Sequence, residues 1–291
     1  MGPAPTMGPA SPRLPGSSSV TTQAKRGAAM DYTQLRVEVD GAIGTITLAR
    51  PDVRNAMSVE MGAELCRAVG ELNGVSELRV VLLRGEGKAF AAGGDFGFLE
   101  DRVADQPERN RRVMRDYYDL FLSIQKLHVP TIAVLQGAAI GAGLCLALAC
   151  DIRLAAPEAK LGVNFVRVGL HPGMGATWLL PRIVGPAKAK ELLFTGRILT
   201  AAEGLPFGLV NAVHPPKELG AAALKMAEAI AASAPLAVSR ARDNLAWTDV
   251  RTLDQALDAE ASAQALDYAS EDMREGLAAA KERRPATFEG R

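Results

Sequence analysis

The 291-residue chain has few cysteines, few histidines and no excess charge of either sign. Its three cysteines, Cys66, Cys145 and Cys150, are too few and too irregularly spaced for a disulfide framework or a CxxC metal site. The three histidines form no HxxxH or HExxH pair, so the sequence offers no helix-borne zinc site and we expect no bound metal. This sparing use of cysteine favours an intracellular protein, which we expect in the cytoplasm.

Basic and acidic residues balance, at 33 each. Such a chain has no electrostatic footprint for nucleic acid or an anionic membrane surface, so we expect neither as a partner. The stretch 131–150 has no charged residue, contains Gln136 and three glycines and is followed at once by Asp151. That composition predicts a buried strand, a tight turn and a buried helix rather than a membrane span.

Residues 1–29 differ in composition from the rest of the chain. Five prolines lie in the first fifteen residues, and the segment has three basic residues and no acidic one. We expect a disordered tail, because this composition offers neither a secretory apolar region nor the amphipathic helix of a transit peptide. Patterned sequence begins at Tyr32, which makes Met30 an alternative start.

The remaining sequence predicts an α/β fold, because short apolar runs alternate with amphipathic segments. After residue 186 the pattern becomes mostly helical. We expect three parts: a tail (1–29), a core (30–230) and a helical C-terminal region (231–291). The expected strands are 35–39, 44–48, 80–83, 131–135 and 151–155. The expected helices are 59–72 with Ser58 as its cap, 107–127, 144–149, 187–194, 200–207, 216–233, 236–247 and 252–282.

Two expected strands run directly into loops of very small residues, 85–95 and 136–143. Small residues let a ligand approach the main chain, whose N–H groups at a strand end or a helix start lack partners. Such donors, with the positive end of a helix dipole behind them, suit a carbonyl oxygen that gains negative charge. For either loop alone, glycines that merely form turns are the simpler interpretation. The chain contains no GxGxxG, GxSxG or GxxxxGK[ST] motif, so dinucleotide, lipase-type and phosphate-loop sites lack their residues.

Taken together, the motifs of residues 32–288 resemble the crotonase (enoyl-CoA hydratase/isomerase) superfamily. The residues that carry this resemblance are Arg50-Pro51 through Asn55-Ala56-Met57-Ser58, residues 88–95, Gly141-Ala142-Gly143 through Cys150-Asp151-Ile152-Arg153, Gly169 with Pro172-Gly173, Thr195-Gly196-Arg197, and Gly208-Leu209-Val210. The stretch 146–155 is most similar to 3-methylglutaconyl-CoA hydratases.

The resemblance implies a spiral of ββα units with a C-terminal trimerisation region, and hence a homotrimer or a hexamer. It also implies an acyl-CoA substrate with no cofactor beyond the coenzyme A of the substrate itself. The N–H groups of Gly94 and Ala142 would form an oxyanion hole for the thioester carbonyl. The residues expected to contact the substrate or its coenzyme A are Arg54, Ala56, Ala92, Gly94, Asp95, Phe96, Gly97, Ala142, Phe165 and Arg283.

The chain departs from the family pattern where hydratases carry two glutamates. Those positions hold Cys145 and Phe165, and the segment around Pro172-Gly173, from which isomerases take an acid, contains none. Ordinary two-glutamate hydration is therefore not expected. His171 is the remaining candidate acid or base, because imidazole titrates near neutrality, and a hydrogen bond that fixes its loop is the alternative.

Other side chains near these motifs have two interpretations each. Cys145 is either a nucleophile at a helix start or a small buried apolar residue, and Phe165 either shapes an acyl pocket or packs in the core. Asn164 and Arg167 either bind a polar acyl tail or lie exposed. The acids that a mobile segment could bring to the site are Glu100, Asp101 and Asp116.

We therefore expect an enzyme that stabilises a thioester enolate for isomerisation, decarboxylation or C–C bond chemistry. A non-catalytic acyl-CoA binding protein and an acyl-CoA thioesterase are the alternatives.

Overall fold

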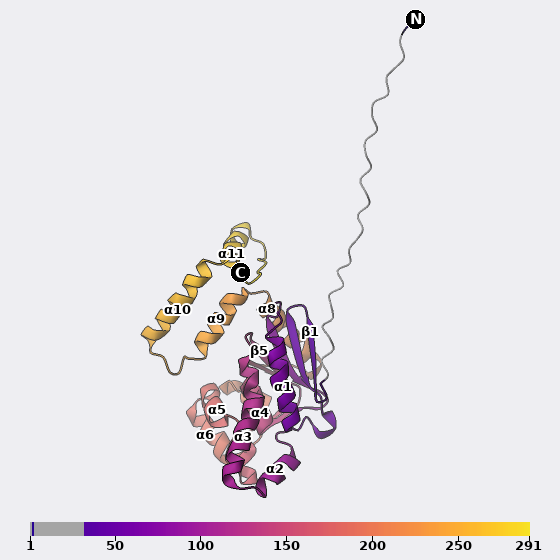
Figure 1. Ribbon diagram of the computed structural model, residues 1–291. Coiled ribbons are helices and arrows are strands. Elements are labelled where there is room, and N and C mark those ends of the chain that lie inside the picture. The colour runs from indigo at the N-terminus through magenta and orange to yellow at the C-terminus, as the bar shows by residue number, and fades with distance from the viewer. Residues whose placement is uncertain (1, 3–31) are drawn as a thin grey trace. The chain divides into compact units, whose positions relative to one another are not determined.

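The computed structural model describes Gly2 and residues 32–291, and Figure 1 shows the course of the chain. The expected disordered tail (1–29) and Met30 lie outside the described residues, apart from Gly2.

The strands form two sheets, one of six strands and one of four. The six-stranded sheet has the order β1-β2-β3-β5-β7-β10 and consists of β1 (Leu35–Asp40), β2 (Ile43–Leu48), β3 (Val80–Gly85), β5 (Thr131–Leu135), β7 (Ile152–Ala155) and β10 (Ala212–Val213). The four-stranded sheet has the order β4-β6-β8-β9 and consists of β4 (Ala89–Ala91), β6 (Ala138–Ile140), β8 (Lys160–Gly162) and β9 (Leu199–Thr200).

Successive strands alternate between the sheets, so that β3 and β4, β5 and β6, and β7 and β8 each place one strand in each sheet. Neighbouring strands are parallel except for the pairs β1–β2 and β8–β9. This repeated passage between two sheets is the expected spiral of ββα units, and the α/β prediction is confirmed.

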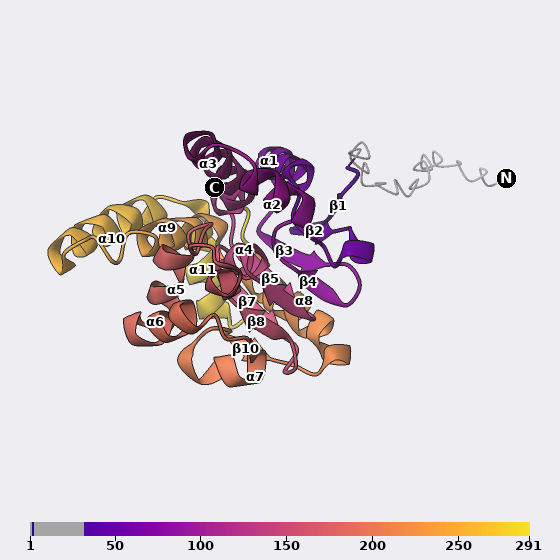
Figure 2. The same cartoon turned by 90° about the horizontal axis from the view of Figure 1, so that it is seen from below.

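The described residues contain eleven α-helices, most of which lie in the second half of the chain (Figure 2). They are α1 (Val59–Leu72), α2 (Phe96–Val103), α3 (Pro107–Leu122), α4 (Ala142–Leu148), α5 (Ala176–Val184), α6 (Pro186–Thr195), α7 (Ala201–Gly204), α8 (Pro216–Ala231), α9 (Pro235–Leu245), α10 (Leu253–Tyr268) and α11 (Glu271–Glu282). Short 3₁₀ helices cover Pro51–Val53, Ser123–Lys126, Asn164–Val168 and Leu205–Phe207.

The predicted start of the domain is confirmed. β1 and β2 pair antiparallel across the turn at Asp40-Gly41, and Ser58 caps α1 by accepting a hydrogen bond from the Met61 N–H. The apolar stripe of α1 is buried as expected, with Leu65, Ala68 and Leu72 fully inside.

Several boundaries differ from the prediction. The long helix expected over 252–282 is two helices: α10 ends at Tyr268 with Ala269 as its C-cap, and Ser270 caps α11. The helix expected over 107–127 ends at Leu122 and continues as a 3₁₀ turn. The loops at 85–97 and 136–143 contain β4, the start of α2 and β6, and α5 was not expected at all. Three-residue strands of small residues carry too little alternation to be recognised by pattern.

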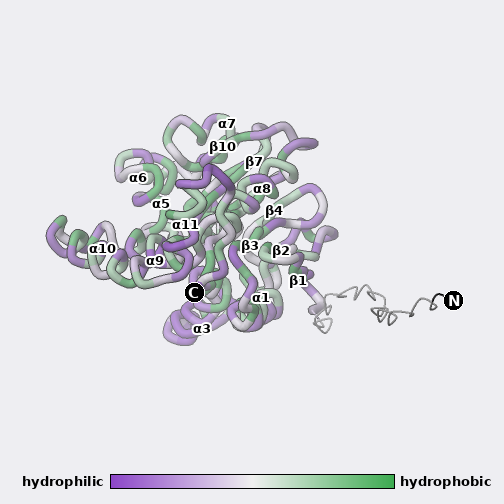
Figure 3. Tube along the Cα trace, turned by 90° about the horizontal axis from the view of Figure 1, so that it is seen from above, coloured by the Kyte–Doolittle hydropathy of each residue, from purple (hydrophilic) through white to green (hydrophobic). Residues whose placement is uncertain are grey.

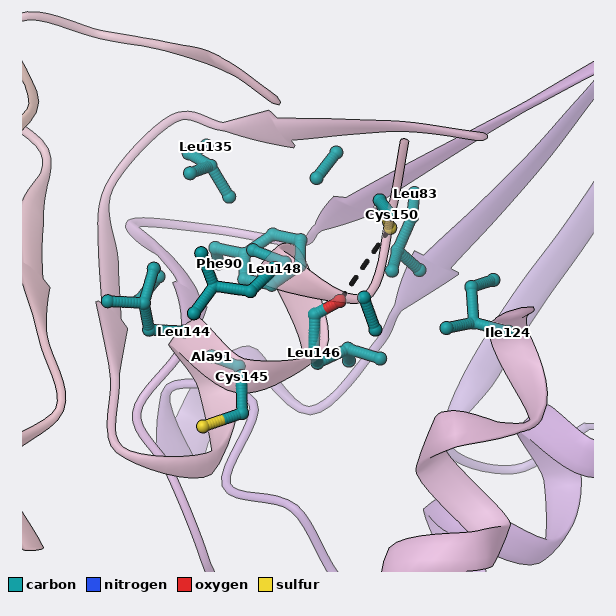
Figure 4. Packing of buried hydrophobic residues seen from close by; sticks show 14 of the residues in the cluster. Leu83, Phe90, Ala91, Ile124, Leu135, Leu144, Cys145, Leu146, Leu148 and Cys150 are labelled. Carbon is teal, nitrogen blue, oxygen red and sulfur yellow. Dashed lines mark hydrogen bonds between the residues drawn. The ribbon is translucent and has the colours of Figure 1, made fainter. Parts of the chain in front are cut away.

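The interior is apolar, and the centre of it is α4, all seven residues of which are buried. Figure 3 shows hydrophobic residues concentrated along the inner strands, and Figure 4 shows Leu144, Leu146 and Leu148 among side chains of other elements. The uncharged run 131–150 therefore forms β5, β6 and α4. No single helix of the described chain has the length and apolarity of a membrane span; α8 and α9 pass such a test only as a pair bent by 105°.

Candidate active site

The site lies where the loops after β4 and β6 meet. Gly93 has a φ of +103°, and a Cβ atom on it would lie 2.9 Å from the Ile140 carbonyl oxygen and 4.0 Å from the Ala142 nitrogen. Only glycine fits so close an approach with that backbone conformation. Gly141, with a φ of +56°, then turns the chain from β6 into α4, so that Ala142 is the first residue of that helix.

Backbone N–H groups without an acceptor lie on both sides of this junction, among them those of Gly94 and Ala142. The neighbours of Gly94 are paired, since the Met57 N–H donates to the Gly93 oxygen at 2.8 Å and the Asp95 N–H donates to the Met57 oxygen at 3.1 Å. Gly94 itself and Ala142, at the start of α4, donate to no oxygen within residues 32–291. Unpaired main-chain donors of this kind are available to a ligand.

Both donors line one cavity of about 130 Å³. Its walls come from the two loops, from α2 and α3, and from the segment after β8. The lining residues are Ala92, Gly93, Gly94, Phe96, Phe98, Leu99, Met114, Tyr117, Tyr118, Ile140, Gly141, Ala142, Asn164, Phe165, Val168, Leu170 and Met174. None of these described lining residues is charged, and only Tyr117, Tyr118 and Asn164 have polar side chains.

The two tyrosines of α3 have different environments. The Tyr117 hydroxyl donates to the Met57 oxygen at 2.9 Å, and its ring stacks on Phe98 with centroids 4.7 Å apart. Burial raises the pKa of the Tyr117 phenol well above its usual value. Burial also raises the pKa of Tyr118, which a backbone hydrogen bond with Met174 partly offsets. Both phenols therefore keep their protons at neutral pH.

Cys145 lies one helical turn beyond Ala142 and is completely buried. Its thiol donates to the Gly173 carbonyl oxygen at 3.6 Å, and Figure 4 shows the side chain among the buried residues around α4. Burial raises the pKa of the Cys145 thiol to about 12. The interpretation as a small buried residue is confirmed, because a thiolate nucleophile needs a lowered pKa and access to solvent.

The residues expected along the coenzyme A arm lie beside the first loop. Arg54 is exposed, and its carbonyl accepts the Ala92 N–H at 3.0 Å. The Arg50 guanidinium donates a hydrogen bond to the Ala56 carbonyl oxygen at 2.7 Å and forms an ion pair with the Asp95 carboxylate at 3.3 Å. Asp95 also caps α2 through the Gly97 N–H. Ala92 and the exposed Phe96 line the cavity, whereas Arg54, Ala56, Asp95 and Gly97 do not.

Of the other predicted residues, two line the cavity and the rest do not. Phe165 and Asn164 line the cavity. Arg167 instead donates to the Thr195 carbonyl at 3.1 Å, and His171 is exposed and outside the lining. Arg283 is the C-cap of α11 and, like Glu100, Asp101 and Asp116, does not line the cavity.

The aromatic wall from α2 and α3 was missed in the sequence. Tyr117 and Tyr118 belong to a helix whose apolar spacing predicts only a buried face, and no local motif indicates which residues of that face meet a cavity.

The chain is similar to known proteins along most of its length. The family model described as enoyl-CoA hydratase/isomerase matches residues 38–291. A crotonyl-CoA hydratase of Syntrophomonas wolfei is 35% identical over 263 residues, which are 89% of this chain and 99% of that protein. The crystal structure of an enoyl-CoA hydratase from Bacillus anthracis superimposes with a TM-score of 0.84 at 34% identity and covers 89% of this chain and 100% of that one. An enoyl-CoA hydratase structure from Polaromonas gives a TM-score of 0.83 at 32% identity, with 87% and 99% covered. The chain therefore belongs to the enoyl-CoA hydratase/isomerase family.

Proposed function

We propose that this protein is an enzyme that binds an acyl-CoA thioester and stabilises its enolate, with the thioester carbonyl oxygen held by the N–H groups of Gly94 and Ala142. The observation that carries the proposal is the pair of unpartnered N–H groups on one cavity. Ala142 adds the positive end of the α4 dipole to its own donor. Donors placed where negative charge develops contribute about 3 to 4 kcal/mol each to transition-state stabilisation.

The chemistry beyond the enolate is proposed from what the cavity holds. Cys145 and Phe165 occupy the positions that the family resemblance assigns to the two hydratase glutamates, and every described lining side chain is uncharged. Activating a water molecule requires a base within reach of it. We therefore propose isomerisation, decarboxylation or C–C bond chemistry rather than two-glutamate hydration. Decarboxylation forms the enolate by loss of CO₂ without a base, whereas isomerisation requires a proton acceptor from outside the described lining. The proposal gives no role to His171, which is exposed outside the lining.

Coenzyme A would lie along the first loop, near Arg54, Ala56, Ala92 and the start of α2. The local similarity to 3-methylglutaconyl-CoA hydratases around residues 146–155 does not bear on the acyl group, because those residues are outside the cavity lining. The proposed setting is the cytoplasm, in keeping with three free cysteines.

The C-terminal helices are proposed to join subunits into a trimer or a hexamer. None of the sixteen residues of α10 is buried, although Leu253, Leu257 and Leu266 lie on it. Apolar surface of this kind is typical of subunit interfaces. Arg283, at the end of α11, does not line the cavity, and its proposed contact with coenzyme A phosphates would be made in such an assembly.

Solvent exchange tests the proposal directly. The protein is incubated in D₂O with saturated and unsaturated acyl-CoA thioesters, and deuterium at the α-carbon and product formation are followed by NMR. Incorporation that depends on the protein is the expected result, because the thioester gives up an α-proton to form the enolate and the enolate then takes a deuteron from the solvent. Tight thioester binding with neither exchange nor turnover across the panel would identify the non-catalytic binding protein instead.

A thioesterase would release free coenzyme A, which a thiol reagent detects in the same incubations. We expect no release that depends on Cys145, because burial holds the pKa of its thiol at about 12.

A further inference from the structure

The fold holds the two proposed oxyanion donors in different ways. The Ala142 N–H shares its peptide group with the Gly141 carbonyl, which accepts the Cys145 N–H at 3.1 Å in the first turn of α4. The Gly94 N–H shares its peptide group with the Gly93 carbonyl in a loop. An isolated parallel β-bridge joins this loop to the segment before α1. The Gly94 donor is thus held by a neighbouring segment, whereas the Ala142 donor is held by its own helix.

Met57, in the segment before α1, sets the direction of the Gly94 donor. Its N–H donates to the Gly93 oxygen at 2.8 Å. Since a trans peptide group is planar, its C=O and N–H point in opposite directions. The bond to Met57 therefore directs the Gly94 N–H away from Met57, and Gly94 lines the cavity. Gly93 has a φ of +103°, and a glycine backbone adopts other conformations readily, so this hydrogen bond is what fixes the direction.

Side chains of two other segments hold the peptide groups on both sides of Met57. Arg50 donates to the Ala56 oxygen at 2.7 Å, which fixes the peptide group that carries the Met57 N–H. The Met57 oxygen accepts the Asp95 N–H at 3.1 Å and the Tyr117 hydroxyl at 2.9 Å. Met57 is completely buried, so water does not replace a hydrogen bond that is lost there.

Tyr117 is well placed to hold a backbone segment still. Its side chain is buried, and its ring stacks on Phe98 of α2 and packs against Phe121 with centroids 5.0 Å apart. The ring lines the cavity, but the hydroxyl hydrogen is already donated to the Met57 oxygen and is not free for a substrate. Because burial raises the pKa of the phenol, this hydrogen bond persists at neutral pH.

We propose that Tyr117 and Arg50 are positioning residues, which hold Met57 so that the Gly94 N–H is directed at the thioester carbonyl oxygen. The inference rests on the proposed function, because it takes Gly94 as an oxyanion donor. The carbonyl oxygen carries more negative charge in the transition state than in the bound substrate. A misdirected donor therefore slows the reaction more than it weakens binding.

Infrared difference spectroscopy tests the direction of the donors, with butyryl-CoA carrying ¹³C at the thioester carbonyl as the probe. Hydrogen bonds lower the stretching frequency of a carbonyl, so binding to the wild-type protein should lower it. In Tyr117→Phe and in Arg50→Met this lowering should shrink to about half, because one of two donors is misdirected. Exchange at the α-carbon should become about tenfold slower, and the calorimetric dissociation constant should change less than about threefold.

Two variants from different segments are used so that a folding defect in one does not decide the test. Tyr268→Phe, the same change as Tyr117→Phe on an exposed residue of α10, should match the wild-type protein in all three measurements. Arg50→Lys keeps a donor and a positive charge, so it should recover part of the frequency shift.

The outcomes separate this inference from the proposed function. A full frequency shift with wild-type exchange in both variants would overturn the positioning role and leave the proposed function standing. Weaker binding with an unchanged frequency in the bound complex would indicate a role in packing alone, and would also overturn it. If the wild-type protein did not bind butyryl-CoA, or bound it without any lowering of the frequency, the proposed function itself would fail.

Discussion

α4 and α10 are both rich in alanine and leucine, yet α4 is buried and α10 is not. Every residue of α4 is buried, whereas α10 buries none of its sixteen residues and packs mainly on α9 and α11. Composition alone therefore does not decide which helix is central. What differs is the surroundings: α4 packs on β4 and β6 of the four-stranded sheet and on α5, while α10 packs on other helices of the C-terminal region.

The backbone at the start of α4 is packed closely against its neighbours. A Cβ atom on Gly143 would lie 2.3 Å from the Ala91 carbonyl oxygen, so β4 and the first turn of α4 leave no room for a side chain. α10 instead begins with a capping box, in which Thr252 and Gln255 satisfy each other's backbone groups. The start of α4 is therefore fixed by its contact with β4, whereas the start of α10 is stabilised by its own capping residues.

The largest expected effect comes from removing a single donor from α4. Ala142→Pro deletes the N–H of the first helical residue, a position that proline already occupies in α3, α6, α8 and α9. We expect the turnover or exchange rate of the best thioester to fall about 10²- to 10³-fold with the helix intact, as measured by NMR and circular dichroism.

Ala142→Gly is the matched control, because it changes the side chain and keeps the N–H. It should lose far less activity than the proline variant. If both variants were equally impaired, the methyl group rather than the donor would be the important feature, and the contrast between a functional α4 start and a purely structural α10 start would fail.

The second prediction concerns stability near the same loop. Asn55 is fully buried with a φ of +55°, accepts the Arg50 N–H and donates to the carbonyls of Glu86, Ala89 and Phe90. Asn55→Ala should lower the free energy of unfolding by about 2 to 4 kcal/mol, because it leaves buried groups unpaired, as measured by urea titration.

Thr252→Ala removes the α10 cap and gives the comparison from the other region. Loss of an N-cap typically costs about 1 kcal/mol. A larger cost for Thr252→Ala than for Asn55→Ala would contradict the view that the loops around α4 depend on tertiary contacts and α10 does not.

Much of the fold was predictable where one pattern acts over several residues. The strand 131–135 and the helix 59–72 with its Ser58 cap were placed at the residue, because alternation, helical spacing and capping agree there. The break between α10 and α11 was not, since Ser270 interrupts an alanine-rich helical pattern without glycine or proline. The division into a tail (1–29), a core (30–230) and a C-terminal region (231–291) stays a prediction.

The candidate site was predictable only in its backbone. The small residues around Gly94 and Ala142 indicated two loops with free donors, and both residues line the cavity. Nothing local showed that α3 would bring Tyr118 to the same cavity, or that His171 would lie outside it. Which side chains from distant segments share a cavity depends on helix packing, and a single sequence does not encode that in any short motif.

The third prediction tests what covers α10. Leu257→Glu combined with Leu266→Glu should reduce the molar mass measured by light scattering from that of a trimer or hexamer toward that of one chain. Both side chains are more than half exposed in the single chain, so charge there disrupts contacts between chains rather than within one. Val39→Glu on β1, a similar change outside the helical region, should leave the mass unchanged. A wild-type protein that is monomeric at micromolar concentration would contradict the proposed role of α10.

The smallest effect is expected from alkylation of the native protein. Cys66 on α1 is exposed, whereas Cys145 in α4 and Cys150 just after it are buried. Burial raises the pKa of both thiols to about 12, so at pH 8 only about one in ten thousand would be a thiolate even with access to reagent. Iodoacetamide should therefore add one group per native chain by mass spectrometry, and three after unfolding in guanidinium. Since a raised pKa suppresses the thiolate until the pH approaches that value, Cys145 should stay unmodified from pH 7 to 9. Rapid labelling of Cys145 in the native state would show that the start of α4 opens to solvent, which would weaken the contrast with α10 and revive the thioesterase alternative.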